Sequence, residues 1–150
     1  MPAAVQQQCF GGRELRKFDQ VNRLAIPAKF RSRYGNTVYL LKNFQGDKCI
    51  IMYSEEDYLT VYDNIAKSVI GAMLTRVQRL FVENTDMAVM DKAGRITVSP
   101  EFQKFAELDG EALIINNPDR IELWNESNWN SQFTEEELPD LSNFNISPRI

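Results

Sequence analysis

Apolar and polar residues alternate in two short segments that resemble each other. In residues 23–26 and again in residues 95–98, every second residue is apolar. This period of two predicts strands with one buried face, and it puts Arg23 and Arg95 on the opposite face. Pro27 follows the first segment and Ser99-Pro100 the second, a typical helix start. The two predicted short helices bury Phe30 and Tyr34 in the first case, and Phe102, Phe105 and Ala106 in the second.

The next apolar runs predict two hairpins and two longer helices. The hairpins pair residues 37–42 with 48–53 and residues 111–116 with 120–124, across turn-rich segments. Ser54 opens a capping sequence, and a second amphipathic stretch runs from Met73 to Phe81. From Thr134 onward polar residues dominate and predict a mobile tail that docks on other surfaces. The predicted helix after Ser54 carries apolar residues at helical spacing at Tyr58, Tyr62, Ile65 and Val69.

An internal duplication underlies these patterns. Residues 18–27 are echoed by residues 90–99, and the order of turn, strand, helix, strand, strand and helix is the same in both halves. Two copies too short to fold alone are expected to share one core. We therefore predict an α+β protein of two pseudo-symmetric tandem modules with helices at the periphery. Its predicted parts are a first module over 9–62, a linking helical segment over 63–84, a second module over 85–133 and an acidic and polar tail over 134–150.

Composition argues against an enzyme. The 150-residue chain has no histidine, which excludes His-dependent triads and His-ligated metal sites. Cys49 lies in an apolar strand pattern with no base to activate it, and no glycine-rich phosphate loop follows a strand. Acid–base pairing among Asp19, Asp91 and Glu122 is the remaining catalytic alternative. We predict no catalytic residues, no cofactor and no metal.

Charge is distributed unevenly along the chain. The net charge is −4, yet residues 1–53 hold nine Lys/Arg against three Asp/Glu, whereas residues 91–150 hold five against twelve. A basic first half is compatible with nucleic-acid binding despite the acidic sum. The sequence contains no apolar run of membrane-spanning length and no signal-peptide pattern, so we predict a cytoplasmic protein without a membrane partner.

Two short turns carry the functional signal. Asp19 is followed four residues later by Arg23, and Asp91 by Arg95. The fourth residue of each turn is Asn22 or Gly94, the two residue types that best tolerate positive φ. We expect each Asp to accept hydrogen bonds from turn amides and to pair with its Arg. A salt-bridged turn without a ligand is the alternative, and the duplication and the basic surroundings of the first turn favour a binding site.

These motifs resemble a known family. Over about residues 9–133 the chain is similar to MraZ transcriptional regulators. The motifs that carry this similarity are the two Asp-x-x-x-Arg turns, Phe10-Gly11-Gly12, Leu24-Ala25-Ile26-Pro27-Ala28-Lys29-Phe30-Arg31 and Arg120-Ile121-Glu122-Leu123-Trp124. The resemblance implies AbrB-like swapped-hairpin modules, an octameric or dodecameric ring, and binding of double-stranded DNA at G-rich direct repeats. It places those repeats in the promoter of the division and cell-wall gene cluster, and the protein at the nucleoid.

The turns depart from the family's usual Asp-x-Lys-Gly-Arg pattern. Val21 and Asn22 stand where Lys and Gly are common, and in the second turn Ala93 replaces Lys although Gly94 is kept. A cation that would read bases or phosphates is therefore missing from both turn centres.

We predict that Arg23 and Arg95 face the major groove, where Arg donates two hydrogen bonds to guanine, worth about 1–3 kcal/mol of discrimination. Asp19, Asp91 and Gly94 are the predicted turn-orienting residues. An oligomeric scaffold or an RNA-binding protein that uses the same basic half is the alternative. The other predicted DNA contacts are Gln20 and Asn22 at bases or phosphates, and Arg13, Arg16, Lys17, Lys29, Arg31 and Lys92 at phosphates.

Overall fold

The computed structural model describes residues 9–133 and 138–148. Its strands are β1 (Arg13–Lys17), β2 (Arg23–Ala25), β3 (Thr37–Lys42), β4 (Ile50–Ser54), β5 (Thr85–Val89), β6 (Arg95–Thr97), β7 (Glu111–Asn116) and β8 (Ile121–Trp124). Its helices are the 3-10 helix η2 (Ala28–Phe30) and the α-helices α1 (Glu55–Ala66), α2 (Ala72–Asn84), α3 (Pro100–Phe105) and α4 (Glu126–Ser131).

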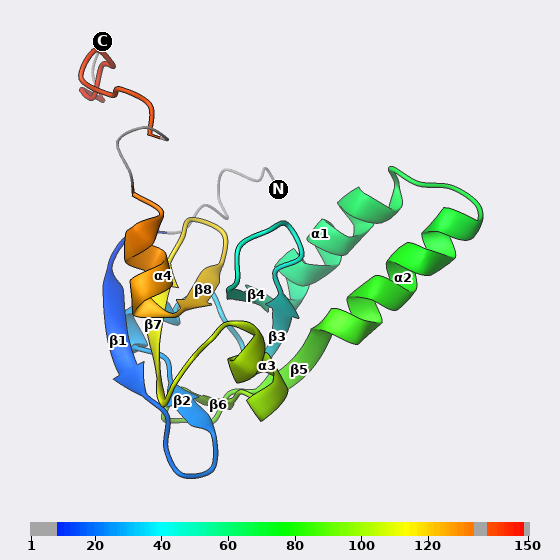
Figure 1. The fold of residues 1–150 in the computed structure, drawn as a ribbon, viewed down its shortest axis with the longest axis horizontal. Coiled ribbons are helices and arrows are strands. Elements are labelled where there is room, and N and C mark those ends of the chain that lie inside the picture. Colours follow the sequence, from blue (N-terminus) through cyan, green and yellow to red (C-terminus); the bar gives the residue numbers. More distant parts are fainter. Residues whose placement is uncertain (1–8, 134–137, 149–150) are drawn as a thin grey trace.

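The strands of the two halves exchange partners within one antiparallel sheet (Figure 1). The sheet has the order β1-β7-β8-β4-β3-β5, and a separate two-stranded ribbon pairs β2 with β6. Since β1 pairs with β7 and β5 with β3, each half lends its first strand to the other half. The predicted α+β class, the duplication and the shared core are confirmed.

An approximate twofold axis relates the copies. Leu24 of β2 lies opposite Ile96 of β6, and Ile51 of β4 lies opposite Glu122 of β8. In both pairs the partners occupy equivalent positions of the duplication. The axis therefore passes through the ribbon and through the middle of the six-stranded sheet.

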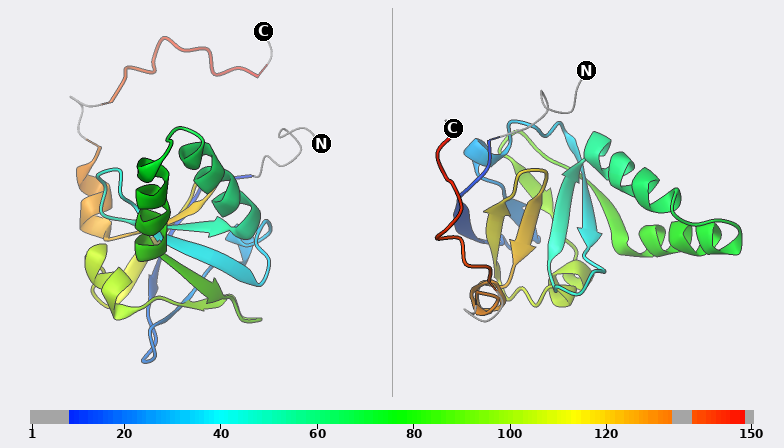
Figure 2. Two further views of the ribbon diagram at one scale, coloured as in Figure 1. Left: turned by 90° about the vertical axis from the view of Figure 1, so that its right-hand side faces the viewer. Right: turned by 90° about the horizontal axis from the view of Figure 1, so that it is seen from above.

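Apolar side chains bury both faces of the sheet. One face packs against the ribbon and the short helices, around Leu24, Ile96, Ile114 and Leu123. The other face is covered by α1 and α2, which bury Phe81, and by α4 through Trp129. Figure 2 shows that the α1–α2 hairpin extends beyond the sheet, as expected of helices at the periphery. No helix in the described ranges is long and apolar enough to cross a bilayer.

The helix starts follow their capping residues. The Ser54 hydroxyl accepts from the Asp57 backbone N–H at 3.2 Å, and Ser99 caps α3 in the same way through Phe102. The first copy differs: Pro27 offers no side-chain cap, so only the single turn η2 forms there.

Several details of the predicted helices are wrong. Phe105 is only partly buried, and the buried Ala106 follows the end of α3. Tyr34, expected inside a first short helix, lies after η2 and is only half-buried against the core. Val69, predicted on α1, lies beyond its end at Ala66. Residues 138–148 of the predicted tail contain no helix or strand, and residues 134–137 and 149–150 lie outside the described residues.

Candidate nucleic-acid interface

The first turn is held together by one carboxylate. Asp19 Oδ1 accepts from the backbone N–H groups of Val21 and Arg23, both at 2.9 Å, while Oδ2 accepts from Arg23 Nε at 2.7 Å. The hydrogen bond from the Arg23 backbone N–H, reinforced by its guanidinium, lowers the pKa of Asp19. Asn22 takes the predicted positive φ, at 65°. The carboxylate therefore stays charged and fixes the guanidinium at the base of the turn.

The second turn repeats this arrangement. Asp91 Oδ1 accepts from Ala93 N–H at 2.9 Å and from Arg95 N–H at 2.8 Å, and Oδ2 accepts from Arg95 Nε at 2.7 Å. Its pKa is lowered first by the backbone N–H of Arg95. Gly94 takes a φ of 81°. The predicted turn geometry is thus confirmed in both copies.

The ribbon presents both arginines on one face. Leu24 and Ile96 are buried beneath it, so the alternate residues Arg23 and Arg95 point the other way. Arg23 lies opposite Thr97, which makes Arg95 its diagonal neighbour at about 7–8 Å. The side chains are 38% and 41% exposed, so neither guanidinium is enclosed.

The fourth residue of each turn contacts the other copy. Asn22 Oδ1 accepts from Gln103 Nε2 of α3 at 3.1 Å. At Gly94, a Cβ would lie 2.6 Å from Cζ of Arg31, so only glycine leaves room for this guanidinium. The two contacts are equivalent under the duplication, because Arg31 and Gln103 occupy matching positions when residues 18–31 are aligned with residues 90–103.

Several of the predicted phosphate contacts are engaged in ion pairs. Arg16 and Lys29 share the carboxylate of Glu14, at 3.2 and 3.4 Å. Together, Arg16, Lys29 and Glu14 carry a net charge of +1. Arg13 lies at the far end of β1 from the first turn and pairs with Glu126 of α4 at 2.8 Å. The structure therefore separates Arg13 from the other candidates.

The remaining candidates lie at the turns. Gln20 and Lys92 occupy equivalent exposed positions at the turn tips, and Lys17 is exposed where β1 enters the first turn. Within the described residues, Lys17 and Lys92 form no ion pair and are available to an anionic ligand.

The contact of Gln103 with Asn22 is not among the contacts expected from the sequence. The duplication signals it, since aligning residues 18–31 with 90–103 puts Gln103 opposite Arg31. What the alignment does not give is the exchange of partners, which brings α3 to the first turn and Arg31 to the second.

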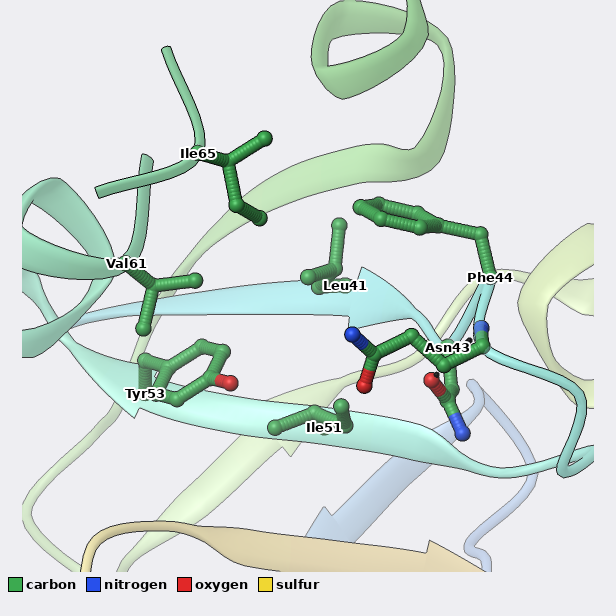
Figure 3. A pocket seen from close by; sticks show the side chains of 8 residues that line it. Leu41, Asn43, Phe44, Ile51, Tyr53, Val61 and Ile65 are labelled. Atoms are coloured by element: carbon green, nitrogen blue, oxygen red, sulfur yellow. Dashed lines mark hydrogen bonds between the residues drawn. The ribbon is translucent and has the colours of Figure 1, made fainter. Parts of the chain in front are cut away.

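Two other features are poor candidates for a ligand site. Burial raises the pKa of the Cys49 thiol to about 12, so the reactive thiolate is disfavoured. A hollow between the sheet and α1, lined by Leu41, Ile51 and Val61, measures about 40 Å³ (Figure 3). That volume suits a water molecule or two rather than a drug-sized ligand.

Comparisons with known proteins identify the family of this chain. A family model described as "MraZ protein, putative antitoxin-like" matches residues 81–147. The protein of Caldicellulosiruptor saccharolyticus named Transcriptional regulator MraZ is 30% identical over 121 residues, which are 80% of this chain and 83% of that protein. This chain belongs to the MraZ family. Another relative of that name, from an Arthrobacter species, is 29% identical over 129 residues, or 85% of this chain and 89% of its own length.

The MraZ assignment and the architecture agree. A mixed α+β chain with a mainly antiparallel sheet is consistent with the AbrB-like fold expected for MraZ proteins. These MraZ relatives are named as regulators of transcription, which are not enzymes.

Proposed function

We propose that this protein is a sequence-specific regulator that binds double-stranded DNA through its two Asp-x-x-x-Arg turns. The observation that carries the proposal is the pair of guanidiniums, Arg23 and Arg95, on one face of the β2–β6 ribbon. Each is solvent-accessible and is held by the carboxylate of its turn, an arrangement that we call the Asp–Arg clamp. A two-stranded ribbon is narrow enough to enter the major groove. The promoter of the division and cell-wall gene cluster, with its G-rich direct repeats, is the proposed target, reached in the cytoplasm at the nucleoid.

Base reading is assigned to the arginines. Each guanidinium uses Nε to hold its Asp, which leaves the terminal nitrogens for guanine O6 and N7. A separation of about 7–8 Å between the two residues is on the order of two base-pair steps of 3.4 Å. Gln20 supplements these contacts from the tip of the first turn. The Asn22 side-chain oxygen already accepts one hydrogen bond from Gln103, so its amide N–H groups are the freer contacts for DNA.

Backbone contacts are assigned to the surrounding cations. Lys17, Lys92 and Arg31 border the turns, and Arg16 with Lys29 adds a further positive charge beside them. Arg13 ranks last because Glu126 already neutralises it. Such contacts position the protein on the duplex and make its affinity fall with salt.

The first test is a titration of DNA from just upstream of the protein's own gene, at several salt concentrations, with scrambled repeats as control. Arg23→Ala and Arg95→Ala should each weaken binding to the native repeats by roughly 5- to 150-fold, the equivalent of about 1–3 kcal/mol. Lys67→Gln on the remote end of α1 serves as the matched control. Unchanged affinity in both arginine variants, with the fold intact by circular dichroism, would refute the proposal.

We also propose that the chain assembles into a ring of eight or twelve copies. Strand β5 forms an open sheet edge, and it exposes Met87 and Val89 directly after α2, which exposes Leu80 and Val82. Open edges and apolar surface of this kind are typical of protein interfaces. Several subunits on repeated sites would then raise affinity through effective concentration.

Light scattering tests this assembly. The unmodified protein should give a ring-sized particle, and Met87→Glu with Val89→Glu should reduce it to small species without unfolding. A monomer at all working concentrations would contradict the ring. A ring that binds no duplex in the salt titration would instead favour the oligomeric scaffold.

A further inference from the structure

A positively charged hollow lies beside the second turn. It measures about 260 Å³, and Arg31, Tyr34, Asn36, Asp91 and Lys92 contribute to its lining. Polar groups make up most of this lining, in contrast to the apolar hollow under α1. It is open to solvent and is therefore accessible to an ion or to a charged group of a larger ligand.

The hollow has an excess of positive charge. The carboxylate of Asp91 is neutralised by Arg95 at 2.7 Å. Within the described ranges Arg31 and Lys92 have no acidic partner, and Arg31 Nε is buried without a hydrogen-bond acceptor. An anion in the hollow would therefore meet two cations without a competing free carboxylate, because Asp91 is already paired with Arg95.

Gly94 leaves room for the guanidinium of Arg31. Its φ of +81° suits glycine, and a Cβ there would come within 2.7 Å of both Nε and Nη1 of Arg31. The absence of a side chain lets the guanidinium lie against the turn backbone next to Lys92. The place of Arg31 thus depends on a glycine at a turn position where the first copy has Asn22.

The equivalent position beside the first turn has no such charge. Gln103 and Gln20 stand where the hollow has Arg31 and Lys92, and Gln103 Nε2 donates to Asn22 Oδ1 and to the Val98 carbonyl. Buried Ala106 and Leu108 take the places of Tyr34 and Asn36. The comparison within one chain shows that neither the fold nor the Asp–Arg clamp by itself demands cations here.

We infer that this hollow binds a phosphate group between the guanidinium of Arg31 and the ammonium of Lys92. The planar guanidinium matches phosphate oxygens through two parallel N–H donors, and Lys adds a point charge. The inference deepens the proposed function, since a phosphate of bound DNA would reach this site. A free phosphate or a nucleotide offers the same chemistry, and the experiment separates these sources.

The first arm uses inorganic phosphate and the full chain, followed by the NMR shifts of the Lys92 and Gly94 amides. We expect saturable shifts that Arg31→Gln/Lys92→Gln abolishes, because this variant replaces both cations by the glutamines found at the equivalent positions of the first turn. Lys67→Gln should retain them. Phosphate that shifts no amide near the second turn, or shifts that survive in the double variant, would overturn the inference.

The second arm uses the duplex repeats. The double variant should reduce the slope of log K against log salt by about 0.9, the value for one lost phosphate contact, while Lys67→Gln leaves it unchanged. A duplex with a neutral methylphosphonate at the contacted position should lose the same affinity with the unmodified protein and nothing with the double variant. An unchanged slope would overturn the DNA phosphate as the ligand.

Failure of the two proposals is distinguishable. If duplex DNA does not bind but inorganic phosphate saturates the hollow, the DNA-binding proposal fails and the free anion becomes the ligand. If Arg23→Ala weakens duplex binding but phosphate finds no site, the hollow inference alone fails.

Discussion

The two turns share the same Asp–Arg geometry and differ in the side chains that contact their fourth residue. In both, an Asp carboxylate accepts from two backbone N–H groups and from an Arg Nε, with distances that agree within 0.1 Å: 2.9, 2.9 and 2.7 Å in the first turn and 2.9, 2.8 and 2.7 Å in the second. The first turn is closed by a neutral amide pair, Asn22 with Gln103. The second has Gly94 under the guanidinium of Arg31.

This difference shows which features are the same in both turns and which vary between them. The clamp sets the direction of Arg23 and Arg95, so any change to it alters the proposed base-reading groups. The fourth residue needs only a positive φ, which Asn and Gly both supply. Its surroundings are free to become neutral in one copy and cationic in the other.

The largest effect should come from Gly94→Ala. A left-handed non-glycine residue costs about 1–3 kcal/mol, and the new Cβ would also displace Arg31. Urea denaturation at one fixed protein concentration measures the loss of unfolding free energy. Asn22→Gly is the matched change in the first turn, and it should cost less because it removes one hydrogen bond without strain. Equal losses would mean that Arg31 does not depend on the glycine.

A smaller effect is expected from Gln103→Ala. Its amide donates to Asn22 Oδ1 at 3.1 Å and to the Val98 carbonyl at 2.8 Å, and loss of such bonds typically costs about 0.5–1.5 kcal/mol. Arg31→Gln, the equivalent change at the second turn, should leave stability nearly unchanged because it breaks no hydrogen bond of the described chain. A greater loss from Arg31→Gln would reverse the comparison.

The smallest effect should appear at acid pH. The pKa values of Asp19 and Asp91 are both lowered from 3.8, so the folded state binds their protons less readily than the unfolded state. Their contribution to stability is complete above pH 3.8 and is lost as the pH falls through the lower folded values. Both carboxylates are exposed to solvent, which limits the effect.

Asp19→Asn and Asp91→Asn should each remove part of this acid dependence, in equal shares because the clamps match. Unfolding curves between neutral pH and pH 3 provide the measurement. A pH dependence that one variant flattens and the other leaves intact would show that the clamps are unequal.

Much of the fold could be predicted from residue periodicity. The alternation in residues 23–26 and 95–98 identified the ribbon strands, and Ser54 and Ser99 marked two helix starts. The end of α1 before Val69 was missed, because apolar spacing alone does not report where a helix stops. The short η2 was also missed, since Pro27 fits a helix start but provides no cap.

The candidate site was only partly predictable. Asp-to-Arg spacing and a turn-forming fourth residue were sufficient for the clamps, because those contacts are local. The contacts from Gln103 and Arg31 join segments about 80 and 60 residues apart and depend on strand exchange, which no local pattern specifies. The ion pairs of Arg13 and Lys29 were missed for the same reason.

The strand pair on the approximate twofold axis distinguishes the two halves of the duplication. Ile51 faces Glu122, a residue that is 8% exposed and whose carboxylate accepts from Trp124 Nε1 and Arg120 Nε at 2.8 and 2.9 Å. A pair of two second halves would place two such carboxylates opposite each other inside one sheet, each with its own Arg120 as partner. A pair of two first halves would place two isoleucines opposite each other at the same point. The two halves are therefore no longer interchangeable at this point of the sheet.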